Sequence, residues 1–550
     1  MLKPTTKLSI YSLSVSLVVC LLLTGSLMAQ EIDRIKLERA EYLENGEQDG
    51  VRFDKVIGGV VFSQKNTRIY GDSAFFFKKQ NLVKIFGRVR IQEGDSITIT
   101  GGRLIYLGNQ KLAQMRENVV YRDPSMTLTT NFLDYDMIEH LAYYYENGKL
   151  VTETNTLTSK KGYYDTDARY ASFKDSVVLR NQDYLVEADT FQFNTVTEVA
   201  YFLGPTVITA KNGTVLNAND GGVYKTRENI SNFSGAVIET PKYLLYGDNL
   251  YGDKNKAYYT ATNNVSLVSK ENDVIISGDF GKYWKEKGIT KIYGNTLMQK
   301  IFDLDTLFLS ADTLISIEDS IPKNERLLAF HNVRIYKPDL QGIADSLSYQ
   351  TADSLIYLYN DPVLWNDNNQ MVADTISIVM SNGRIDKMFM DTNAFVTSLA
   401  VDEFYNQVKG RNMIVFFKES QLQQVDVNGN GESIYFELEE SDSLVMGMNK
   451  VVCSNMRLKF EQQKVAFITF YSPDGSFIPF HEIRTDDMKL VNFSWRAYER
   501  PTRESVVTSG SISRQRPPFL QPKTRDALLV PPDMSGKPSE NNINKLQEVN

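Results

Sequence analysis

One segment of the chain carries oxygen-bearing side chains at the spacing of a calcium-binding loop. It reads Asp426-Val427-Asn428-Gly429-Asn430-Gly431 and is followed by Glu437, which matches the D-x-[DN]-x-[DN]-G-x5-E pattern of an EF-hand. An EF-hand also requires a helix on each side of the loop. The flanking stretches QLQQV and SIYFELEE look like strands, and Asn-Gly-Asn-Gly favours a hairpin turn. We therefore predict a turn here and no metal site.

Other kinds of chemistry find little support in the sequence. The three histidines, His140, His331 and His481, are far apart, and none has the spacing of metal ligands. The chain has no G-x-S-x-G segment, no P-loop and no dinucleotide-binding fingerprint. We predict a protein that is not an enzyme, with no catalytic residues, no metal and no cofactor.

The composition fits a secreted protein rich in strands. The chain has 550 residues, of which 30 are Tyr and 29 are Phe, and aromatic residues favour strands. Lys3 and Lys7 precede an apolar run that ends in small residues, so residues 1–29 are predicted to be a signal peptide cleaved after Ala29. Loss of these two lysines moves the formal charge from −8 to −10, which argues against a nucleic-acid partner. The remaining chain has one cysteine, Cys453, and so no internal disulfide.

A repeated strand pattern dominates the rest of the sequence. In the stretch GRVRIQEGDSITITGGRLIY (87–106) apolar residues alternate with polar ones, and the pair Gly101-Gly102 then switches the parity. The apolar set is Val89, Ile91, Ile97 and Ile99 before the switch, and Leu104 and Tyr106 after it. Because alternate residues of a strand share one face, we predict an apolar inner face and a β-bulge at the glycine pair.

The same pattern recurs along the chain. A V-x-[ILV] strand is followed by a turn, a second strand and a small residue with Asp, as in EADTFQF (187–193) and SADTLIS (310–316). Val333 and Ile335 align with Val89 and Ile91. Recurrence at about 20–35 residues predicts a solenoid-like array. The repeated Asp fits a role in bonding nearby backbone N–H groups.

Proline marks where the array ends. Seven of the sixteen prolines follow residue 500, and proline is disfavoured inside strands. We predict that the array spans residues 30–470, that residues 471–500 form a cap over its last strands, and that residues 501–550 are a Pro-rich disordered tail.

The segment 71–123, which includes GDSAFFF and VKIFGRVRIQEGDSITITGGRLIYLGNQKLAQMRENVVYRD, resembles the OstA/LptA family of organic-solvent-tolerance and lipopolysaccharide-transport proteins. The whole chain resembles the long OstA-like proteins of Bacteroidota-type bacteria. The resemblance implies an all-β fold, an elongated antiparallel β-jelly-roll that is V-shaped in section. It also implies that acyl chains lie between the two sheets and that members stack end to end.

These observations predict a periplasmic, non-enzymatic protein, free or associated with the outer membrane, that shields acyl chains in an apolar trough during transit to the outer membrane. The predicted partners are lipopolysaccharide or a lipid A-type glycolipid, other envelope transport proteins with similar jelly rolls joined by end-to-end strand pairing, and further copies of the chain. Two alternatives are an outer-membrane assembly or scaffold subunit and a β-helical polysaccharide-processing enzyme. The residues predicted to line the trough are Val89, Ile91, Ile97, Ile99, Leu104, Val333 and Ile335.

Overall fold

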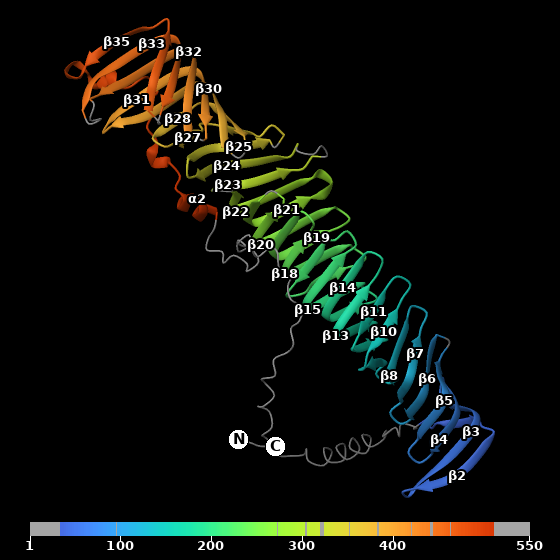
Figure 1. Ribbon diagram of the computed structural model, residues 1–550. Helices are drawn as coiled ribbons and strands as arrows, with labels where there is room; N and C mark the ends of the chain where they lie inside the picture. Colours follow the sequence, from blue (N-terminus) through green and yellow to red (C-terminus); the bar gives the residue numbers. More distant parts are fainter. Residues whose placement is uncertain are drawn as a thin grey trace, which may run out of the picture.

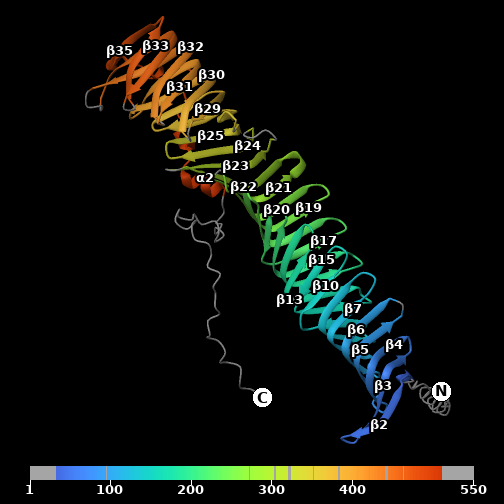
Figure 2. The same cartoon turned by 45° about the vertical axis from the view of Figure 1, so that its right-hand side comes forward.

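The computed structural model describes residues 33–510, apart from gaps at 95, 272, 303–304, 320–323, 351, 382–383, 420, 440–443 and 462–463. Within these residues, 35 strands form one sheet. Figures 1 and 2 show the strands stacked in chain order into an elongated array, from the blue strands β2–β5 to the orange strands β30–β35. The predicted all-β, elongated antiparallel fold is confirmed. The predicted signal peptide (1–29) and most of the predicted tail (501–550) lie outside the described residues.

Some strands are short because a loop interrupts them, and the others run without interruption across the width of the array. The first part of the array comprises β1 Lys36–Arg39, β2 Tyr42–Gln48, β3 Val51–Gln64, β4 Thr67–Phe77, β5 Leu82–Glu93, β6 Ile97–Leu107, β7 Leu112–Arg122, β8 Thr127–Asp136, β9 Leu141–Tyr144, β10 Gly148–Val151, β11 Thr156–Ser159 and β12 Lys161–Asp165. The central part comprises β13 Tyr170–Arg180, β14 Tyr184–Asn194, β15 Val199–Ala210, β16 Val215–Ala218, β17 Gly222–Lys225, β18 Ile230–Glu239, β19 Tyr243–Asp253, β20 Tyr258–Ser269, β21 Val274–Trp284, β22 Ile289–Ile301, β23 Thr306–Ile317, β24 Arg326–Lys337, β25 Leu340–Gln350 and β26 Leu355–Tyr359.

The last part of the array is built from longer strands and ends in short helices. It comprises β27 Val363–Asn366, β28 Asn369–Val372, β29 Thr375–Ser381, β30 Arg384–Val401, β31 Phe404–Lys418, β32 Gln421–Leu438, β33 Val445–Glu461, β34 Lys464–Tyr471 and β35 Asp474–Pro479. The helical segments are η1 Lys285–Lys287, η2 Phe480–Glu482, η3 Thr485–Met488, η4 Ala497–Glu499 and α2 Arg503–Gly510.

Most long strands bend at a register shift near their middle. Between β5 and β6 the pairing runs to Phe86↔Arg103 and resumes at Val89↔Gly101. The extra residues, Gly87 and Arg88, have φ of 74° and 42°. A β-bulge of this kind bends a strand, so each long strand contributes to two walls. Wall 1 consists of the strand halves that contain residues 82–86, 170–174 and 289–293 and of the halves paired with them. Wall 2 consists of the strand halves that contain residues 89–93, 177–180 and 296–301 and of the halves paired with them.

The Asp of the repeated motif supports the bulge on the following strand. The carboxylate of Asp279 accepts a hydrogen bond from Nδ2 of Asn295 at 2.7 Å, and that of Asp72 forms an ion pair with Arg88 at 2.8 Å. The same arrangement joins Asp248 to Asn264, Asp312 to Asn332 and Asp374 to Asn393. Each donor has a positive φ. At these five positions the repeated Asp therefore binds the side chain of a bulge residue on a neighbouring strand, whereas Asp253 accepts from the local Lys256 N–H, as we predicted.

The glycine pair lies opposite the bulges and not within one. Ile99 and Leu104 lie on opposite parities of β6, yet both are fully buried, so the predicted parity switch at Gly101-Gly102 is present. The extra residues belong to the neighbours β5 and β7. A Cβ on Gly101 would lie 2.8 Å from Cγ of Met115. The prediction of a bulge at the glycine pair was therefore wrong, because these glycines allow the bulged neighbours to approach closely.

The segment that resembles an EF-hand also lies at a bulge. Residues 426–431 fall inside β32, which continues to Leu438. Gly429 and Asn430 have φ of 80° and 52°, and Asp426 is paired with Arg457 at 2.7 Å. The predicted hairpin turn was wrong because Asn-Gly supplies the left-handed conformations that a bulge needs as readily as those of a turn.

The C-terminal segment 480–510, which we call the strap, runs along the outer face of wall 2. Leu490 packs in a cluster with Phe395, Ile434, Phe436 and Met448, and Val506 of α2 packs against Leu297 and Phe308 of β22 and β23. In Figure 1 the strap descends from β35 to α2 beside β22. We predicted a cap over the last strands at residues 471–500 and a disordered tail from 501. In the structure, the strands continue to Pro479, residues 480–500 cover the last strands, and Arg503–Gly510 form α2, whose Val506 is fully buried.

Three buried glutamines on the outer face of wall 2 hold the strap. The Gln407 amide donates to the Met488 carbonyl at 2.7 Å and accepts from the Leu490 N–H at 2.9 Å. Gln370 makes the equivalent pair of bonds to Ser494 and Arg496. Gln341 accepts from the Arg500 guanidinium. Each amide replaces the water that it loses on burial with hydrogen bonds to the strap.

We expect Gly101→Val to lower the free energy of unfolding by about 1–3 kcal/mol, because the added atoms overpack the buried contact with Met115. The urea midpoint followed by far-UV circular dichroism measures the change. Thr100→Val, on the same strand, should stay within about 0.5 kcal/mol of the parent. An unchanged midpoint for Gly101→Val would show that the close approach at this glycine does not matter.

Candidate functional site

The two walls are in contact at the N-terminal end of the array. Phe62 of wall 2 lies edge-on to Phe76 of wall 1, with ring centroids 5.4 Å apart. The Tyr106 hydroxyl donates to Oε1 of Gln64 at 2.5 Å across the interior. Ile35 also packs into this cluster. The interior from β3 to β6 is therefore largely filled by the protein's own side chains.

The walls are also in contact at the C-terminal end, where methionines fill much of the space. Met388, Met390 and Met413 of wall 1 cluster with Met371 and Val396 of wall 2. All five have at most 9% of their surface exposed. Methionine side chains adapt to irregular gaps, and here they fill much of the interior from β28 to β31.

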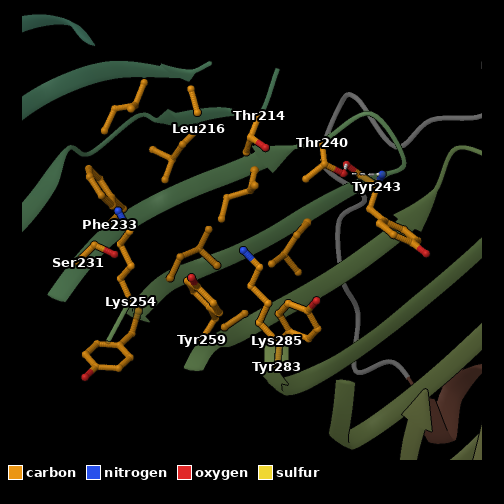
Figure 3. A pocket seen from close by; sticks show the side chains of 18 of the residues that line it. Thr214, Leu216, Ser231, Phe233, Thr240, Tyr243, Lys254, Tyr259, Tyr283 and Lys285 are labelled. Carbon is orange, nitrogen blue, oxygen red and sulfur yellow. Dashed lines mark hydrogen bonds between the residues drawn. The ribbon is translucent and has the colours of Figure 1, made fainter. Parts of the chain in front are cut away.

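Between these two closed ends lies an open trough. It encloses a cavity of about 2780 Å³ that extends from the turn before β6 to the start of β30. The N-terminal buried cluster ends at Val265 and the next begins at Met298. The buried apolar clusters are thus interrupted between β20 and β22. Figure 3 shows side chains that line the cavity on the N-terminal side of this break, from Thr214 to Lys285.

The two sides of the trough differ in chemistry. Wall 1 is lined by rings that contact one another, as in Phe202 with Phe191 at 5.4 Å and with Phe233 at 5.7 Å. Its aromatic residues are Phe173, Phe191, Phe193, Phe202, Tyr224, Phe233, Tyr259 and Tyr283. Wall 2 is aliphatic and is lined by Leu179, Val186, Ile208, Leu216, Ile238, Leu245, Leu267 and Ile276. All of these aliphatic residues except Val186 remain partly exposed, so wall 2 offers apolar surface that no part of the described chain covers.

Charged groups also line the cavity. The Lys337 ammonium is held between Asp305 and Asp339, each at 2.8 Å. Burial raises the pKa of Tyr243, and the carboxylates of Glu325, Glu318 and Glu271 raise it further. Several carboxylates therefore lie at this end of the cavity, together with Lys300 and Arg326.

The residues predicted to line the trough all lie on the inner face, but they fall into two groups. Ile97 and Ile335 line the open cavity. The others are nearly fully buried where the walls meet, namely Val89, Ile91, Ile99, Leu104 and Val333. Alternation identifies the inner face, whereas the width of the gap between the walls decides whether that face is open. The partly exposed residues of wall 2 were missed because their alternation is the same as that of residues in the packed parts, so the pattern does not separate the two groups.

Reactive side chains do not gather anywhere in the described part of the chain. No group of three or more His, Cys, Asp or Glu residues there could hold a metal ion. His331 is exposed and lies 3.0 Å from Asp345, and Cys453 is buried, which raises the pKa of its thiol. Among the described helices, none has the length and apolar character needed to cross a membrane.

The fold and the trough define an elongated two-walled β array with an apolar interior. Residues 32–189 match the family model described as OstA-like protein, so the predicted resemblance is confirmed for this part of the chain. No curated protein matches. Among solved structures, one match is LptH of Pseudomonas aeruginosa, described as the LptA-homologous periplasmic component of the conserved lipopolysaccharide transport device. It has 11% identity and a TM-score of 0.19, and the match covers 21% of this chain and 79% of that chain.

The two walls should respond differently to truncation. We expect Phe202→Ala to lower the free energy of unfolding by about 3–5 kcal/mol, because this ring is 5% exposed and packs between two others. Ile208→Ala should cost less than half as much, because Ile208 is already partly exposed to the cavity. Urea denaturation of both variants measures the difference, and equal losses would contradict the division into a packed wall and an open wall.

Proposed function

We propose that the trough binds the acyl chains of lipopolysaccharide, or of a related lipid A-type glycolipid, and shields them from water during transit to the outer membrane. No chemical step is part of this role. The observation that carries the proposal is the row of partly exposed aliphatic side chains on wall 2, which faces a continuous cavity. Such a surface is unfavourable in water unless something apolar covers it.

The size of the cavity favours a large apolar ligand. Pockets for small molecules usually enclose about 300–1,000 Å³, and the trough is several times larger. Each CH₂ group that moves from water into the trough gains about 0.8 kcal/mol. A chain of about a dozen such groups gains on the order of 10 kcal/mol. An apolar lining is therefore sufficient for affinity.

The OstA-like match supports a role in envelope lipid transport, although it covers only residues 32–189. The predicted signal peptide at residues 1–29 supports a location in the periplasm. The open trough lies mostly beyond the matched residues. The role that we propose therefore rests on the geometry of the central strands as much as on the family.

Site-specific photocrosslinking in cells tests this proposal. A photoreactive residue at Ile208 or Leu267 should capture lipopolysaccharide, because both positions line the cavity. The adjacent positions Thr209 and Val268 point to the other face of the same strands and serve as matched controls. A probe at Ile99 should capture little, because this residue is 1% exposed in the closed part. Labelling that is equal at all five positions, or absent from all of them, would contradict the proposal.

We further propose that the array joins other arrays end to end through its last strands. Among the described residues, β34 and β35 each pair with β33 on one side only. Phe467 and Phe477 of these strands are 63% and 49% exposed. An unpaired edge with exposed apolar side chains favours addition of a further strand. The partner is another envelope protein of this fold or a second copy of the chain.

The double variant Phe467→Glu/Phe477→Glu should reduce self-association of the mature protein, because charge on an edge strand opposes pairing. Light scattering after size exclusion, over a range of concentrations, measures the oligomer. Tyr498→Glu is the control, because Tyr498 is 85% exposed on the strap, away from these strands. Self-association that falls equally in the control would contradict a role for this edge.

A further inference from the structure

A row of equivalent positions runs along the mouth of the trough on wall 1. Each is the first residue after a strand of wall 1. Its backbone N–H donates to the carbonyl of the residue just before the strand that pairs with it. Lys254 donates in this way to Asn229 and Lys285 donates to Ala257, both at 3.0 Å. The six positions that line the cavity are Thr166, Thr195, Thr226, Lys254, Lys285 and Glu318. Neighbouring positions lie two strands apart, which corresponds to about 10 Å. The backbone therefore places these six side chains at the same level of the rim.

The threonines and the lysines of this row differ in what their side chains can still bind. The Thr226 hydroxyl donates to the Glu198 carbonyl at 2.7 Å, and Thr166 and Thr195 make equivalent bonds. Lys254 and Lys285 are exposed. Within the described ranges, neither ammonium group takes part in an ion pair. These two cations remain available to a ligand, unlike that of Lys337, which lies between two carboxylates.

The two lysines lie beside the break between the two large buried clusters. The break between the two large buried clusters falls between Val265 and Met298, on the strands that Lys254 and Lys285 border. Figure 3 shows both lysines among the side chains that line the cavity, together with the rings of Tyr259 and Tyr283. A ligand whose apolar part occupies this region has its polar part at the level of the lysines.

The charge of the rim changes sign immediately after Lys285. The next position of the row is Glu318, and Glu271 and Glu325 also line the cavity there. Lys300 and Arg326 line the same stretch of the cavity, so carboxylates and cations alternate there, whereas Lys254 and Lys285 are two consecutive cations of the row that attract an anionic group. Among the six positions of the row, Lys254 and Lys285 are therefore the ones that favour an anionic head group.

We propose that Lys254 and Lys285 bind the phosphate groups of a lipid whose acyl chains occupy the trough below them. This inference rests on the proposed function and adds the class of head group. An ammonium group donates charge-assisted hydrogen bonds to phosphate oxygens. Because both lysines are solvated, we expect the pair to strengthen binding by about tenfold, and we expect salt to weaken this contribution.

The test compares bisphosphorylated lipid A with the same lipid after removal of both phosphates. Binding of each to the mature full-length protein is measured in detergent below its critical concentration. The parent should bind the phosphorylated form about tenfold more tightly. Lys254→Gln/Lys285→Gln should lose this preference and keep its affinity for the dephosphorylated form. Lys79→Gln/Lys287→Gln removes the same charge from exposed positions outside the row and should behave as the parent, and the thermal unfolding of both variants should match that of the parent.

The outcomes separate this inference from the proposed function. If the lysine double variant keeps the preference for phosphate, or if the control loses it equally, the lysine site is overturned while lipid binding in the trough stands. If the parent binds neither lipid, the proposed function fails. Inorganic phosphate is added as a competitor. Displacement of the phosphorylated lipid by millimolar phosphate would show a site for free anions and would overturn the assignment to a lipid head group.

Discussion

The interior of this protein depends on the left-handed residues at the middle of its strands. A straight strand turns alternate residues to opposite faces, so its two halves cannot enclose a space. A pair of bulge residues such as Gly87-Arg88 bends one strand. The parity switch at Gly101-Gly102 lets both halves of the next strand turn their apolar residues to the interior. The carboxylate of an Asp on one strand then binds the Asn or Arg of the bulge on the next. The repeated Gly, Asn and Asp therefore form the bend at which wall 1 meets wall 2, and they do not form a series of turns.

The same corner supports two kinds of interior. Where aromatic residues such as Phe62 and Tyr106, or methionines such as Met388 and Met413, reach across the gap, the walls are in contact and the interior is solid. In the centre, the aromatic side chains of wall 1 pack along their own wall. The aliphatic side chains of wall 2 are then left facing a cavity. One repeated backbone plan thus yields packed ends and an open middle.

Much of this architecture could be predicted from the sequence, because strand alternation and the recurrence of a unit are local properties. The inner face of Val89, Ile91 and Leu104 followed directly from parity. Whether a given inner residue meets the opposite wall or a cavity depends on the distance between walls, which no local pattern encodes. The strap was missed for a related reason. Gln341, Gln370 and Gln407 have the outward parity of residues that face water, and nothing in the sequence around them shows that a distant segment replaces the water.

The strap affects how the last third of the array can unfold. In a stack of strands, each unit contacts only its neighbours, so units can open one at a time. Buried amides on β25, β28 and β31 and the contacts of Val506 with β22 and β23 all depend on one continuous segment. Opening any of these strands exposes an outer face that the strap covers and releases contacts that hold the rest. We therefore expect this region to open as a single cooperative unit and the middle of the array, which the strap does not cover, to open in smaller steps.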